Sequence, residues 1–68
     1  MFELFLFVCF GHRLDAMQCE LIKHNQIFNN SQICEIKQVF EVEYFTINLR
    51  RFYSEAKVVG LCREANNV

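Results

Sequence analysis

The sequence predicts a small α+β domain over residues 1–68, in the order strand, helix, strand, helix, with a two-stranded sheet covered by two helices. Three observations predict it. The first segment, Met1–Phe10, is an almost unbroken apolar run. A later segment, Ile33–Leu49, is dense in β-branched and aromatic residues. The segments that follow these two, His12–His24 and Asn48–Val59, repeat apolar residues at helical spacing.

Met1–Phe10 is predicted to be a buried strand, because its apolar residues would occupy both faces of a strand, as in the centre of a sheet. Two other interpretations remain open. One is a signal or membrane-surface segment, with Cys9 and Gly11 as the small residues before a cleavage point, and the other is a short buried helix. Glu3 has the wrong charge for the basic start of a signal peptide. A membrane-crossing helix needs about 20 apolar residues, so we expect no transmembrane span.

Two amphipathic helices are expected after the two strands. The apolar stripe of His12–His24 consists of Leu14, Met17 and Leu21. In Asn48–Val59, Asn48 is the predicted N-cap, and Gly60 is expected to end the helix in the left-handed conformation. The remaining residues, Cys62–Val68, are expected to form a frayed tail.

Ile33–Leu49 is predicted to be the second strand, because Val39–Ile47 has the composition of a strand. The residues Asn29–Ser31 before it predict a turn, and they also form a glycosylation sequon that matters only in a secreted chain. Helical spacing is present as well, at Ile33, Ile36, Phe40, Tyr44 and Ile47. A strand this apolar would aggregate at an open edge, so we expect it to pair with Met1–Phe10 or with a second copy of the chain.

The four cysteines form no C-x-x-C motif. Their wide, irregular spacing favours buried, reduced thiols, and a secreted scaffold with two disulfides is the alternative. One mixed set supplies two thiols and two imidazoles of the kind that zinc binds, namely Cys9, His12, Cys19 and His24. Its spacing matches no zinc motif, so no metal site is predicted.

Other chemistry-bearing residues are few. Glu41 and Glu43 would share a face of a strand, but an isolated carboxylate pair is more typical of a solvated stripe. Arg50–Tyr53 places cations beside aromatic rings, yet no wider basic patch supports base stacking. We therefore predict no catalytic, cofactor-binding or metal-binding residues and no enzyme activity, and no segment carries the motif of a known family.

The charge balance also limits the function. Seven basic and eight acidic residues give a net charge of −1, so nucleic acid is not an expected partner. The leading hypothesis is a small non-enzymatic protein that uses its apolar strand surface to associate, either with itself as a homo-oligomer or with another protein partner. One alternative is a short secreted or membrane-surface peptide with a degenerate N-terminal targeting segment. Another is a short reading frame without a functional product, because the residue usage indicates AT-rich coding.

Overall fold

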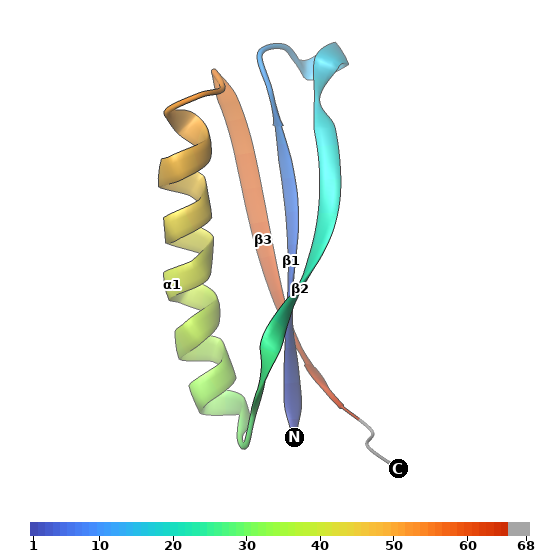
Figure 1. The fold of residues 1–68 in the computed structure, drawn as a ribbon, viewed down its shortest axis with the longest axis vertical. Helices are drawn as coiled ribbons and strands as arrows, with labels where there is room; N and C mark the ends of the chain where they lie inside the picture. Colours follow the sequence, from blue (N-terminus) through green and yellow to red (C-terminus); the bar gives the residue numbers. More distant parts are fainter. Residues whose placement is uncertain (66–68) are drawn as a thin grey trace.

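The computed structural model describes residues 1–65, which form three strands and one long helix (Figure 1). In chain order the elements are β1 (Phe2–Gly11), the short 3-10 turn η1 (Leu14–Ala16), β2 (Gln18–Phe28), α1 (Ser31–Arg50) and β3 (Glu55–Glu64). The sheet has the order β2-β1-β3 and is antiparallel throughout. The predicted strand–helix–strand–helix order, with a two-stranded sheet under two helices, is therefore wrong.

The apolar first segment is the central strand of the sheet. β1 pairs along its length with β2 on one side and with β3 on the other. Both neighbours run antiparallel to β1 and therefore parallel to each other, so the chain must cross the sheet between them, and α1 makes that crossing. The prediction that Met1–Phe10 forms a buried strand is confirmed.

The segment predicted as the first helix, His12–His24, is mostly strand. Only Leu14–Ala16 forms a helical turn, and the chain then enters β2. Pairing with β1 sets the conformation here, because Cys19 and Leu21 lie opposite Cys9 and Phe7. A short helical spacing of apolar residues carried no information about that long-range pairing.

The segment predicted as the second strand, Ile33–Leu49, is the core of α1. The helix begins where Asn30 caps it, with the Asn30 side-chain oxygen accepting a hydrogen bond from the backbone N–H of Ile33 at 2.8 Å. The predicted turn at Asn29–Ser31 does connect β2 to α1, although Ser31 is already helical. The prediction of a strand, which was based on composition, is therefore wrong. The N-cap at Asn30 and the helical spacing of the apolar residues agree with the helix that forms.

The segment predicted as the second helix, Asn48–Val59, contains the end of α1, a turn and half of β3. Asn48 is not an N-cap, since its side chain donates a hydrogen bond to the carbonyl of Tyr44 within α1 at 2.7 Å. Gly60 does not adopt the left-handed conformation and lies in the middle of β3. Of the predicted tail Cys62–Val68, residues 62–64 belong to β3 and residues 66–68 lie outside the described residues.

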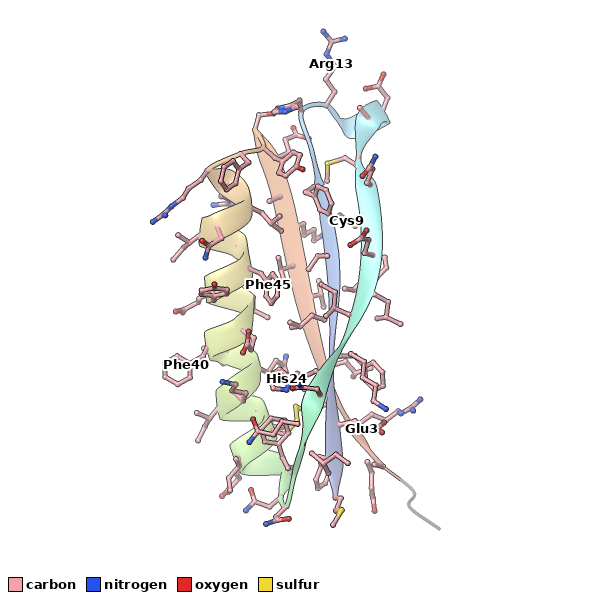
Figure 2. The ribbon with its side chains drawn as sticks, in the orientation of Figure 1. Glu3, Cys9, Arg13, His24, Phe40 and Phe45 are labelled. Carbon is pink, nitrogen blue, oxygen red and sulfur yellow. A yellow bond between two sulfur atoms is a disulfide. The ribbon has the colours of Figure 1, made fainter. Side chains whose placement is uncertain are left out.

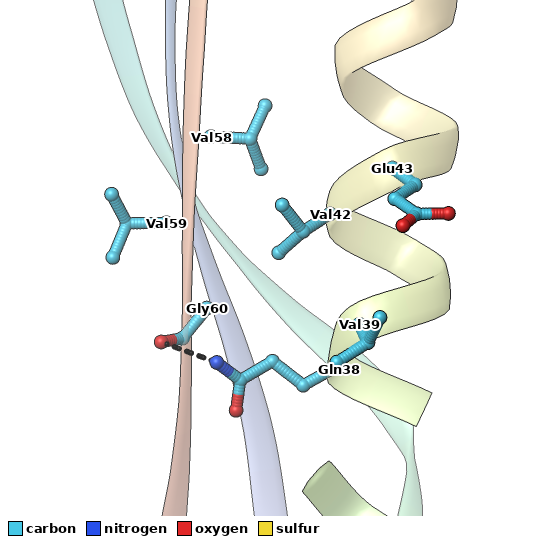
Figure 3. Close-up of a pocket in the computed structure, with 7 residues that line it drawn as sticks. All are labelled: Gln38, Val39, Val42, Glu43, Val58, Val59 and Gly60. Carbon is cyan, nitrogen blue, oxygen red and sulfur yellow. Dashed lines mark hydrogen bonds between the residues drawn. The ribbon is translucent and has the colours of Figure 1, made fainter. Parts of the chain in front are cut away.

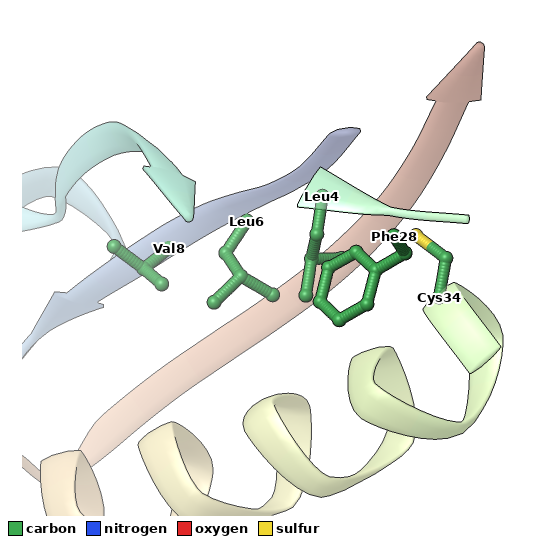
Figure 4. Close-up of a cluster of buried hydrophobic side chains, with 5 residues drawn as sticks. All are labelled: Leu4, Leu6, Val8, Phe28 and Cys34. Atoms are coloured by element: carbon green, nitrogen blue, oxygen red, sulfur yellow. The ribbon is translucent and has the colours of Figure 1, made fainter. Parts of the chain in front are cut away.

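The core is small and lies between α1 and one face of the sheet (Figure 4). Its buried residues are Leu4, Leu6, Val8, Phe28 and Cys34. Three of these five come from alternate positions of β1, because alternate side chains of a strand point to the same face. Removing β1 would therefore remove most of the core as well as the centre of the sheet.

All four cysteines are paired, which corrects the expectation of reduced thiols. Cys34 at the start of α1 is bonded to Cys62 near the end of β3, with their Cα atoms 6.1 Å apart. Cys9 and Cys19 face each other across β1 and β2, with their Cα atoms 4.1 Å apart. The first bond ties the helix to the sheet and the second joins two neighbouring strands.

Candidate association surface

α1 carries apolar side chains on two opposite sides. One side packs on the sheet and consists of Cys34, Val42, Phe45 and Leu49, with Gln38 among them. The other side, which we call the outer face of α1, consists of Ile33, Ile36, Phe40, Tyr44 and Ile47. These five side chains are between 48% and 65% exposed. Figure 2 shows Phe45 directed toward the sheet and Phe40 directed away from it.

The two sides follow from the spacing of residues in the sequence. At about 100° per residue, the five residues of the outer face fall within an arc of about 80°, and the sheet-facing residues are centred roughly opposite that arc. A surface helix normally has one apolar stripe and one polar side, and a helix that is apolar on both sides is normally buried. In residues 1–65, nothing covers the second stripe of α1.

Charged side chains border the outer face on one flank. The Lys37 ammonium lies 3.4 Å from a carboxylate oxygen of Glu41, one helical turn away. His24 on β2 also approaches Glu41, at 3.5 Å. Lys37, Phe40, Glu41 and Tyr44 line a shallow hollow, so the apolar stripe and its charged border form a continuous surface.

A groove separates α1 from β3, the strand at one edge of the sheet (Figure 3). It has a volume of about 370 Å³ and is lined mainly by valines, Val39 and Val42 from α1 and Val58 and Val59 from β3. Gln38 crosses it, and its side-chain amide donates a hydrogen bond to the carbonyl of Gly60 at 3.0 Å. A Cβ atom on residue 60 would overlap the Gln38 side chain, so glycine permits this close approach.

The face of the sheet opposite α1 is a second apolar surface, which we call the open sheet face. Its centre consists of Phe5, Phe7, Leu21, Val59 and Leu61, which are neighbours in the register of the three strands. Leu21 is 67% exposed and Leu61 is 58% exposed, whereas Phe5 is half-buried beneath the Arg63 guanidinium, 5.1 Å from its ring centre. Four of these five side chains are between 48% and 67% exposed, whereas all five are exposed on the outer face of α1.

Glu3 closes one end of the open sheet face. Its carboxylate lies 3.1 Å from the Lys23 ammonium of β2 and 3.4 Å from the Arg63 guanidinium of β3. The hydrogen bond from Lys23 is the main cause that holds the pKa of Glu3 below its ordinary value of 4.5, and Arg63 acts in the same direction. Glu3, the only charged side chain of Met1–Phe10, thus forms ion pairs with both strands that flank β1.

The residues considered for zinc do not form a site. Cys9 and Cys19 are bonded to each other, so neither offers a thiolate to a metal. His12 lies near the turn before β3, where the Ser54 hydroxyl donates a hydrogen bond to its carbonyl at 2.9 Å, while His24 faces Glu41. Among residues 1–65, no cluster of three or more histidine, cysteine or acidic side chains is placed to hold a metal ion.

The other candidate groups are separated too. Glu41 and Glu43 are two residues apart on a helix, so they point in widely different directions and do not form a carboxylate pair. Of the aromatic residues in Arg50–Tyr53, Phe52 is 74% exposed, whereas the Tyr53 ring packs on Phe10 with centroids 4.7 Å apart. The expected inward stripe of a second helix is therefore absent from this part of the described chain.

Comparisons with protein-family models, with curated proteins and with solved structures return no match. No helix within residues 1–65 is long and apolar enough to cross a membrane. The outer face of α1 was missed as a surface because its residues were assigned to a strand, although its helical spacing was visible in the sequence.

Proposed function

We propose that this chain is a non-enzymatic protein that acts by association, and that the outer face of α1 is its binding surface. The observation that carries the proposal is the second apolar stripe of α1, five large side chains on the side away from the sheet. The sequence had suggested an apolar strand as the binding surface, and the helix replaces it because one side of β1 is already buried under α1.

The size of the stripe supports the proposal. A large aliphatic or aromatic side chain offers on the order of 200 Å² of surface, so five half-exposed side chains provide about 500 Å². This is near the upper end of the apolar patches that monomeric proteins expose. Two such patches facing each other would bury about 1,000 Å², which reaches the lower range of specific interfaces.

Sedimentation equilibrium of the oxidised full chain tests the proposal. We expect a species heavier than the 8.1 kDa of one chain, and we expect Phe40→Glu to return it to that mass, because a carboxylate would be placed in the centre of the stripe. Leu61→Glu is the matched control, since Leu61 is similarly exposed but lies on the open sheet face. Circular dichroism checks that both variants fold.

Two results would count against the proposal. A wild-type chain that remains at 8.1 kDa at about 100 μM would not self-associate in the range where weak interfaces are populated. If Leu61→Glu dissociates the assembly and Phe40→Glu does not, the open sheet face is the binding surface instead.

A secreted or cell-surface role is the second candidate, and the pairing of all four cysteines favours it. Disulfides persist in oxidising compartments and are rare in the cytosol. Asn29, in the sequon, is exposed at the bend between β2 and α1, where a glycan would not disturb the fold. Intact-mass spectrometry of the native product would show both disulfides and, in a eukaryotic host, a glycan on Asn29; four free thiols would contradict this role.

A further inference from the structure

We infer that the partner of the outer face of α1 is a second copy of the same helix, packed antiparallel about Phe40. This inference rests on the proposed function and adds the identity and orientation of the partner. The spacing of the stripe is the first reason. Relative to Phe40 its residues lie at −7, −4, 0, +4 and +7, so the pattern is the same in both chain directions. A two-fold axis that passes Phe40 at right angles to the helix therefore places the stripe of one copy against the same stripe of the second copy.

Such an axis brings together residues whose numbers add to 80. Ile33 meets Ile47 of the second copy, Ile36 meets Tyr44, and the two Phe40 side chains meet at the centre. Every large side chain of the stripe then has an apolar neighbour, as an isologous interface requires. Because α1 has 20 residues and is about 30 Å long, the contact would extend along most of the helix.

The charged flank is the second reason, and it distinguishes the two possible helix directions. In an antiparallel pair the same flanks of the two helices come together. Glu41 of one copy then lies within two residues of the level of both Lys37 and Glu41 in the other, an axial offset of about 3 Å in each case. Each copy already holds Lys37 and Glu41 together at 3.4 Å, so in the pair each Glu41 has two lysines beside it, and these offset the repulsion between the two Glu41 carboxylates.

A parallel pair would place opposite flanks together. The closest charged neighbour of Glu41 would then be Glu43 of the second copy, again about 3 Å away along the axis, and the two carboxylates would repel each other. The helix dipoles would also point in the same direction side by side, which is the less favourable arrangement. In the antiparallel pair the two Glu43 residues are about 9 Å apart along the axis, and the helix dipoles oppose each other.

Two double variants test the orientation, each replacing the same two apolar residues at the ends of the stripe. In Ile33→Lys/Ile47→Glu, an antiparallel pair places each introduced lysine opposite a glutamate. In Ile33→Lys/Ile47→Lys, the matched control, the same positions hold two pairs of like charges. We expect the dissociation constant of the control to exceed that of the first variant by at least about tenfold at low salt, and the difference to shrink in high salt.

The outcomes separate this inference from the proposed function. A dimeric wild type in which the two double variants are weakened equally would overturn the antiparallel pairing and leave the association surface intact. A monomeric wild type would overturn both. Circular dichroism shows whether each variant folds, and the exposed positions of Ile33 and Ile47 leave the core unchanged. If either double variant does not fold, Lys37→Glu and Glu41→Lys replace it: each alone should weaken the dimer, and their mixture should restore it as a heterodimer.

Discussion

Replacing Cys34 and Cys62 together with alanine is expected to lower the free energy of unfolding by about 4 kcal/mol. The bond closes a loop with a sequence separation of 28 residues, and the chain entropy that such a bond removes from the unfolded state corresponds to about 3.5 kcal/mol. Cys34 is also fully buried, so losing its sulfur removes packing worth roughly 1 kcal/mol more. The total is comparable to the whole stability of a domain this small, about 3–10 kcal/mol.

The bond between Cys9 and Cys19 provides the matched comparison. Its sequence separation is only 10 residues, which corresponds to about 2.5–3 kcal/mol in the same treatment, and Cys19 is exposed, so little packing is lost. The double variant Cys9→Ala/Cys19→Ala should therefore be the more stable of the two. This ranking follows from the longer loop that the Cys34–Cys62 bond closes and from the burial of Cys34.

Urea denaturation followed by far-ultraviolet circular dichroism measures these free energies. All samples need the same protein concentration, because association also adds apparent stability. Adding a reductant to the wild type breaks both bonds and should unfold most of the chain. The reasoning would be refuted if Cys34→Ala/Cys62→Ala stayed within 1 kcal/mol of the wild type, or if it were more stable than Cys9→Ala/Cys19→Ala.

Three further changes test the fold with the same assay. Asn30→Ala removes the cap of α1 and should cost about 1 kcal/mol, whereas Asn29→Ala, one residue earlier, should cost much less; equal losses would argue against the cap. Leu6→Ala empties a site that is 1% exposed and should cost about 2–5 kcal/mol, while Leu21→Ala, at a 67% exposed site, should stay within about 0.5 kcal/mol. Glu3 has a lowered pKa when folded, so its ion pairs stabilise the fold above about pH 4.5 and are lost as the pH falls through the folded pKa; Glu3→Gln should flatten this acid dependence, and an unchanged pH profile would contradict it.

The central strand could be predicted from the sequence, because in Met1–Phe10 the apolar residues alone indicate the structure. Met1–Phe10 would be apolar on both faces of a strand. Such a strand is expected at the centre of a sheet, and β1 is the central strand. β2 could not be predicted in this way, because its conformation depends on pairing with β1. Its pairing is also irregular, with a register shift opposite the stretch of β1 between Glu3 and Phe5, so apolar and polar residues do not alternate regularly along it. Likewise, spacing alone could not show that distant cysteines would meet, since the fold brings them together.

The error at α1 and the proposed function have the same physical origin. A helix with one apolar stripe is recognised by its period, but α1 has two stripes on opposite sides, so its apolar residues look almost continuous and its composition resembles that of a strand. The sheet covers one stripe, and that accounts for Val42, Phe45 and Leu49. Packing on the sheet does not explain the apolar residues of the outer face of α1, which is centred on Phe40. If these served only the fold of a single chain, polar residues there would leave stability unchanged and improve solubility. Their presence on the uncovered side is the reason that we propose a second helix as a partner of α1 beside the sheet.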